Sequence, residues 1–231
     1  MQDSEEMNVQ VEAEEPQQKK KGWKREVIEW VLSILIAVVL AYTIREFVFT
    51  LVTVNGESME PSLHNSDRLY VNRFFYSPEK GDVIIFKPAS DPEHPYVKRV
   101  IATEGDTVYI DFNTGNVYVN DALLDEPYIK EKVGRKGNYG TYIESLIKSG
   151  KYSKANPIVI QEGHIFVMGD NRNNSKDSRH LGQIPLGDVM GGAVFRFWPL
   201  DNLGSVHEDA VITTSELTEE ELPWDSEYGL G

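Results

Sequence analysis

Residues 82–101, DVIIFKPASDPEHPYVKRVI, contain two apolar runs that predict β-strands, with a turn-rich segment between them. The runs at 82–86 and 96–101 are rich in β-branched and aromatic side chains, which favour strands. Three prolines and an aspartate separate the runs and indicate a turn. This stretch therefore predicts a β fold.

The same pattern continues along the chain and extends the prediction to one mostly antiparallel β domain over residues 49–207. Asn113-Thr114-Gly115 separates two of the runs and predicts a hairpin in which Gly115 takes a positive φ. The sequence has neither internal repeats nor a regular alternation of strands with helices. The other predicted strands are 52–54, 68–71, 107–110, 116–119, 162–168 and 192–198.

Residues 130–157 do not fit this strand pattern. They are rich in lysine, glycine and tyrosine, with weak helical character around Tyr142–Lys148. The sequence predicts an insertion or lid-like loop here and leaves its role open.

Residues 27–48 predict a single transmembrane helix that serves as an uncleaved signal anchor. Its centre has no charge, and its flanks extend it to the roughly 20 residues that a bilayer requires. A buried core helix is the alternative, and no small-residue pattern closes the run as a cleaved signal peptide requires. The basic flank places residues 1–26 in the cytoplasm and the rest of the chain outside. This flank consists of Lys19, Lys20, Lys21, Lys24 and Arg25.

The net charge of −14 comes from the two ends of the chain. Residues 1–18 carry six acidic and no basic side chains, and residues 208–231 carry eight and none. This composition predicts solvated acidic tails, with 208–231 disordered. The other 23 acidic residues balance the 23 basic ones, so no nucleic-acid surface is expected. Because the chain has no cysteine, disulfides and a cysteine nucleophile are excluded.

Ser58 is a candidate nucleophile because it opens the tight segment ESMEPSL, 57–63, just after a predicted strand. A serine hydroxyl needs a neighbouring base to take its proton. None of the five histidines has a triad-like setting. Lys98 is the other candidate base, since strand alternation places it with Val100, where desolvation favours the neutral amine. From this stretch alone, an exposed lysine beside Arg99 is an open alternative.

A dense polar run, MGDNRNNSKDSR at 168–179, offers groups that can hold a lysine amine in place. A plain surface loop is the alternative. A calcium loop is excluded, because an arginine stands where an oxygen ligand is required, and no metal site is predicted. The groups of interest are the Ser175 hydroxyl, the Asp170 and Asp177 carboxylates, and the Arg172 and Arg179 guanidinium groups that would pair with them.

Four stretches, in this order behind the apolar helix, resemble the sequence boxes of the type I signal peptidase family. The eleven-residue last box is the most specific of them. The stretches are SMEPSL at 58–63, RLYVN at 68–72 with GDVIIF at 81–86, YVKRVIA at 96–102, and GDNRNNSKDSR at 169–179.

The resemblance implies a membrane-bound serine endopeptidase that cleaves signal peptides from exported preproteins after small residues. Ser58 would be the nucleophile, with its own N–H as an oxyanion donor, and Lys98 the general base. The fold would be the antiparallel β fold of signal peptidases and LexA. We expect a monomer at the lipid bilayer that uses no cofactor.

The resemblance also implies supporting roles around this pair. Ser175 would hydrogen-bond and orient Lys98, and Asp177 with Arg179 would brace the site, with Asp170 in a supporting role. The residues expected to line shallow apolar pockets for the substrate are Val52, Val54, Tyr96 and Val97. One position departs from some members, which place a serine two residues before the nucleophile, where this chain has Gly56.

Two alternatives to the signal peptidase remain at this point. A LexA-type self-cleaving regulator shares serine–lysine chemistry, but the apolar helix and the last box argue against it. A non-catalytic, membrane-anchored β domain is the other, and the presence of both Ser58 and Lys98 argues against it.

Overall fold

The computed structural model describes residues 22–47, 49–134 and 139–206. The acidic stretches predicted as tails lie outside these described residues. The chain divides into two compact units, one ending at Tyr42 and the other beginning at Thr43. Each unit is described separately below.

Helix α1, Trp23–Phe47, is the main element of the first unit and begins earlier than the predicted residue 27. Its side chains are exposed from Trp23 to Thr43. By length and composition alone, this stretch is suited to crossing a membrane.

The larger sheet of the second unit has eight strands, and its neighbouring strands are antiparallel, as predicted. Its order is β1-β2-β11-β3-β4-β9-β10, with β12 paired to β11. The central strand β3 is buried along its whole length. The bounds are β1 Phe49–Thr53, β2 Arg68–Asn72, β3 Val83–Phe86, β4 Tyr96–Ala102, β9 His164–Met168, β10 Ile184–Pro185, β11 Val189–Trp198 and β12 Gly204–Ser205.

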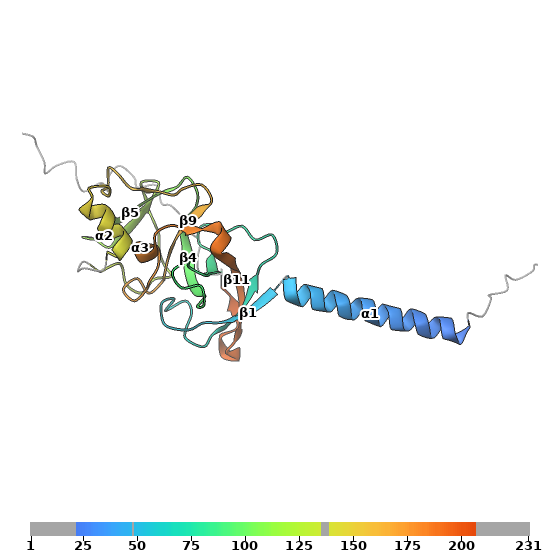
Figure 1. Ribbon diagram of the computed structural model, residues 1–231. Coiled ribbons are helices and arrows are strands. Elements are labelled where there is room, and N and C mark those ends of the chain that lie inside the picture. Colours follow the sequence, from blue (N-terminus) through green and yellow to red (C-terminus); the bar gives the residue numbers. More distant parts are fainter. Residues whose placement is uncertain (1–21, 48, 135–138, 207–231) are drawn as a thin grey trace, which may run out of the picture. The chain divides into compact units, whose positions relative to one another are not determined.

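The smaller sheet has the order β7-β6-β5-β8 and contains the predicted hairpin. Gly115 in the turn has a φ of +77°, which confirms the prediction for this position. Figure 1 shows β5 and helix α2 at one end of the β unit, and β1 and β11 at the other. The bounds are β5 Thr107–Asp111, β6 Asn116–Val119, β7 Ala122–Leu123, β8 Ile158–Val159 and α2 Thr141–Lys148.

Several short elements are not predicted by the sequence pattern. Strands β7, β8, β10 and β12 have two residues each, too few to show an alternation. Helix α3, Ser178–Leu181, ends the polar run and is a single turn. Two 3-10 turns at Leu186–Asp188 and Leu200–Asn202 complete the described elements.

The topology brings the predicted site residues together. Strand β4 carries Lys98 and pairs with β9, with Arg99 opposite Met168. The polar run leaves the end of β9 and therefore starts beside β4. The segment after β1 carries Ser58 and contacts the same loop, because Asn171 donates its backbone N–H to the Ser58 carbonyl oxygen at 3.1 Å.

Candidate active site

Lys98 and Ser58 are 40 residues apart in the sequence and meet in the structure. Lys98 Nζ donates hydrogen bonds to Ser58 Oγ at 2.6 Å and to the Val97 carbonyl oxygen at 2.7 Å. Lys98 is 4% exposed, and burial lowers its pKa to about 8. The prediction of a desolvated lysine is confirmed, and the alternative of an exposed one is wrong.

The position of β4 explains this burial. The strand lies between β3 and β9, and its residues from Val97 to Ala102 are all buried. Val100, on the same face as Lys98, packs in an apolar cluster with Ile84 and Phe86 of β3. The lysine amine therefore exposes little of its surface to water, and this burial disfavours its charged form.

Asp177 and Arg179 form a buried ion pair near Lys98. Arg179 Nε donates to Asp177 Oδ1 at 2.9 Å and its Nη2 to Oδ2 at 2.8 Å. Burial alone would raise the pKa of Asp177, but Arg179 and the Gly169 N–H outweigh it and lower the pKa to about 2. Asp177 therefore stays ionised in its pair with Arg179.

Ser175 is buried in the same loop but does not hold Lys98 in the predicted way. Lys98 donates its hydrogen bonds elsewhere, and the Ser175 hydroxyl has no hydrogen bond of ordinary geometry among the described residues. It lies beside Asp177 and contributes to the low pKa of that carboxyl. Gly169 allows this packing, because a Cβ there would lie 2.7 Å from Ser175 Cβ and collide with the Ser58 carbonyl oxygen.

The other acid and arginine of the polar run find partners outside it, which corrects the predicted pairing within the run. Asp170 accepts hydrogen bonds from Arg99 Nε at 2.9 Å and Arg99 Nη2 at 2.6 Å, and both side chains are buried. Arg172 pairs with Glu126 and donates its Nε to the Gly169 carbonyl oxygen at 3.2 Å. Proximity in the sequence suggested local pairs, but the loop turns these side chains toward other elements.

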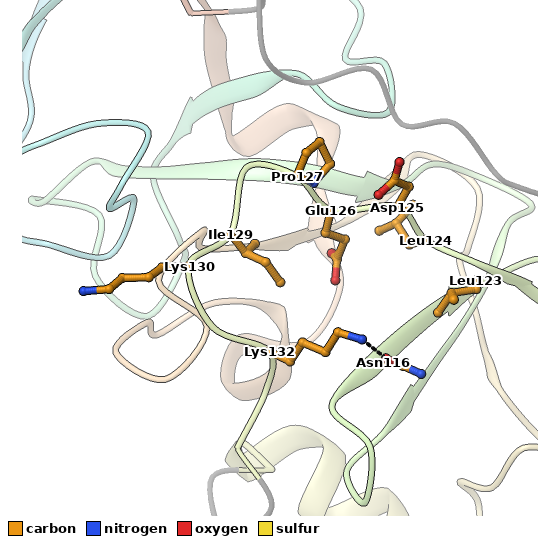
Figure 2. A pocket seen from close by; sticks show the side chains of 9 residues that line it. All are labelled: Asn116, Leu123, Leu124, Asp125, Glu126, Pro127, Ile129, Lys130 and Lys132. Carbon is orange, nitrogen blue, oxygen red and sulfur yellow. Dashed lines mark hydrogen bonds between the residues drawn. The ribbon is translucent and has the colours of Figure 1, made fainter.

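The segment 123–132 braces the polar run, although the sequence does not predict it as part of the site. Together with Asn116 it lines a pocket of about 370 Å³. Figure 2 shows Glu126 among the lining side chains and the bond from Lys132 to Asn116. The Tyr128 ring lies 4.1 Å from the Arg99 guanidinium carbon. The Glu126 contact joins residues 46 positions apart, and no local sequence pattern reports such a pair.

A cleft of about 280 Å³ opens beside Ser58. Three of the predicted pocket residues, Val54, Tyr96 and Val97, line it. Val52, two residues before Val54, is not among its lining residues and packs against the apolar core that contains Val54 and Val97. The remaining lining residues are Thr53, Asn55, Met59, His94, Pro95, Lys98 and Lys176.

The backbone N–H of Ser58 is a free donor, whereas that of Gly56 is bonded. Gly56 has a φ of +97°, a conformation that side chains rarely adopt, and its N–H donates to Asn65 Oδ1 at 2.9 Å. Within the part of the chain that the structure describes, the Ser58 N–H has no hydrogen-bond partner. It is thus available to bind an oxygen atom. A serine at position 56 would be strained in this conformation.

A serine hydroxyl bonded to a buried lysine amine, with a free backbone N–H at the serine, offers the groups that a serine hydrolase requires: a base beside the hydroxyl and a donor for an oxyanion. Across residues 22–47, 49–134 and 139–206, no group of three or more His, Asp or Glu side chains is placed to hold a metal ion.

Comparison with known proteins identifies the family. Residues 27–198 match the family described as "Signal peptidase, peptidase S26", and the chain belongs to this family. It is therefore an enzyme, a serine peptidase of the signal peptidase I type, as the sequence predicted. As a signal peptidase it has exported preproteins as substrates.

Two sequence relatives agree with this assignment. Signal peptidase IB of Staphylococcus aureus (strain COL) is 39% identical over 181 residues, covering 76% of this chain and 92% of that protein. Signal peptidase I P of Bacillus subtilis subsp. natto is 38% identical over 189 residues, covering 80% and 96%. A solved signal peptidase I from Enterococcus faecalis V583 is 29% identical, covers 51% of this chain and 97% of its own, and has a TM-score of 0.38.

Proposed function

We propose that Ser58 attacks the peptide bond at the end of a signal peptide while Lys98 acts as the general base. The observation that carries this proposal is the 2.6 Å hydrogen bond between Lys98 Nζ and Ser58 Oγ in a buried setting. With a pKa of about 8, roughly one lysine in ten is neutral at pH 7. For an exposed lysine the neutral fraction is below about one in a thousand.

The reaction would proceed in two halves. Ser58 Oγ bonds to the carbonyl carbon as its proton passes to Lys98 Nζ, and the Ser58 N–H stabilises the oxyanion that forms. The C–N bond then breaks, the lysine ammonium gives its proton to the leaving amine, and the signal peptide remains as an ester on Oγ. Water, deprotonated by the same amine, hydrolyses this ester, and the proton returns to Oγ.

The ion pairs around Lys98 would allow its pKa to stay low enough for the amine to act as a base. Asp177 and Asp170 each attract a proton to the lysine, whereas burial and Arg179 act against it. Because each carboxylate is already paired with an arginine, burial has the largest effect. In this proposal Ser175 supports the site through Asp177 rather than by a direct bond to Lys98.

Substrate choice would rest on the small cleft beside Ser58. Its apolar walls, including Val54, Met59 and Val97, leave room for alanine-sized side chains and disfavour larger ones. A pocket of this kind discriminates by about 1–3 kcal/mol per methylene. The proposal is therefore cleavage after a small-x-small sequence.

The apolar helix would anchor the enzyme in the membrane as a single span over residues 27–48. Its exposed apolar side chains are stable in lipid and unstable in water. The basic residues before it would keep residues 1–26 in the cytoplasm, with the catalytic domain, 49–207, outside and monomeric. A tether of this kind raises the effective concentration of enzyme at membrane-bound substrates.

Cleavage of a preprotein by the full chain in detergent tests the proposal. Ser58→Ala and Lys98→Met should each abolish cleavage, whereas Ser77→Ala, at an exposed serine, should leave it unchanged. Thermal melts of all variants confirm that they are folded. Cleavage that survives either of the first two substitutions contradicts the mechanism.

A second experiment tests the proposed orientation in the membrane. Protease added to intact protoplasts should degrade the β domain, and full protection of this domain contradicts the orientation.

A further inference from the structure

We propose that Asn171 is a positioning residue that aims the Ser58 N–H at the oxyanion. This inference rests on the proposed role of Ser58 as the nucleophile. Gly56 has no side chain that can donate a hydrogen bond, so the direction of one backbone N–H becomes decisive for stabilising the negative charge.

Asn171 binds both carbonyl groups that flank the nucleophile. Its Nδ2 donates to the Glu57 carbonyl oxygen at 3.1 Å, and its backbone N–H donates to the Ser58 carbonyl oxygen at 3.1 Å. The Glu57 carbonyl and the Ser58 N–H belong to one planar, trans peptide unit and point in opposite directions. A hydrogen bond that fixes the carbonyl therefore fixes the direction of the N–H as well.

The chain on both sides of Asn171 is held by buried ion pairs. Asp170, immediately before it, is bonded twice to Arg99, and Arg172, immediately after it, is paired with Glu126. The side chains of these four residues are at most 6% exposed. Asn171 is thus presented to the Glu57–Ser58 peptide from a loop that is fixed at both neighbouring positions. In this proposal the two buried ion pairs hold the loop that positions Asn171 at the Glu57–Ser58 peptide.

Asn171 shares the restraint with the turn itself. The Glu57 carbonyl oxygen also accepts a hydrogen bond from the Glu60 N–H at 3.1 Å. Loss of the Asn171 amide should therefore loosen the peptide without releasing it. We expect kcat to fall about tenfold, less than the 10²–10³-fold typical of deleting an oxyanion donor.

The test compares Asn171→Ala with the wild-type full chain in detergent. The measurements are kcat and KM for a preprotein, the pH midpoint of kcat/KM, and the inhibition constant of a peptide boronic acid ending in alanine. The boronate adduct on Ser58 places a negatively charged oxygen where the oxyanion forms. Asn173→Ala is the matched control, because its amide bonds to residues 131–134 and not to the Ser58 peptide.

We expect kcat to fall and the boronate inhibition constant to rise by the same factor of about ten, with KM and the pH midpoint unchanged. Asn171→Asp keeps the shape, cannot donate to the carbonyl, and should lower kcat at least as much, which covers the case of a poorly folded alanine variant. Values of kcat within twofold of the control in both variants overturn the inference. A tenfold fall in kcat with an unchanged inhibition constant for the boronate also overturns it.

The same set of assays includes Ser58→Ala. Cleavage by that variant overturns the proposed function and this inference together. An inactive Ser58→Ala beside an Asn171→Ala enzyme of wild-type activity overturns the role of Asn171 alone.

Discussion

Replacing Lys98 with methionine should abolish cleavage and stabilise the folded protein at neutral pH. The methionine has nearly the same length and no charge, so it removes a buried cation and leaves the cavity filled. A lysine whose pKa falls from 10.5 to about 8 on folding destabilises the folded state by about 3 kcal/mol at pH 7. The hydrogen bonds lost to Ser58 and Val97 offset about 1 kcal/mol of this, leaving a net gain of about 2 kcal/mol.

The gain should disappear as the pH rises. Between pH 8 and 10.5 the unfolded chain keeps the lysine proton while the folded chain has lost it, so the stability of the wild type increases with pH in this window. The lysine penalty falls to about 2 kcal/mol at pH 9 and to about 1 kcal/mol at pH 10. The difference between the two proteins should then be about 1 kcal/mol at pH 9 and near zero at pH 10.

Urea titrations of the full chain in detergent, followed by tryptophan fluorescence at pH 7, 9 and 10, measure this difference. Lys151→Met, at an exposed lysine, is the control and should show no pH-dependent gain. A Lys98→Met protein that is less stable than the wild type at pH 7, or a difference that is equal at pH 7 and pH 10, refutes the reasoning.

Three other perturbations have outcomes set by the same site. The value of kcat/KM should rise with pH, with its midpoint at an apparent pKa of about 8, because only the neutral amine is a base. A flat profile from pH 6 to 9 contradicts this. Glu126→Gln should destabilise the fold by about 3–5 kcal/mol in urea titrations by stranding buried Arg172, with a smaller cost when Arg172→Met is added. Gly169→Ala should lower kcat at least about tenfold by crowding Ser175, whereas Gly187→Ala, with open space around the new Cβ, should match the wild type.

The fold could be predicted as far as its strands are long enough to show a pattern. Strand β4 and the hairpin around Gly115 follow from alternation and turn chemistry, which are local properties. The two-residue strands have no pattern of their own and form because longer neighbours offer free hydrogen-bonding groups. The sheet order also lies beyond the sequence, because β11 inserts between β2 and β3 from more than a hundred residues away.

The site residues likewise fall into those with a local sequence signal and those whose partners depend on the fold. Ser58 and Lys98 stand in distinctive local stretches, so their chemistry could be weighed before their contact was known. The partners of Asp170 and Arg172 could not be predicted, because many acids and bases were available and only the folded loop selects Arg99 and Glu126. Asn171 had no signal at all, since its importance depends on which carbonyl its amide reaches.

In the proposed mechanism, the arginines explain how a lysine base could work among carboxylates. Two acids lie close enough to Lys98 to raise its pKa, and a buried carboxylate without a partner would keep the amine protonated. Arg179 and Arg99 each bind one of these acids through two nitrogens, and burial, the largest effect on the amine, lowers its pKa. The same pairs fix the loop that carries Asn171. In the proposed mechanism, one set of buried charges would therefore serve both the base, by letting its pKa fall to about 8, and the oxyanion, by holding the peptide that binds it.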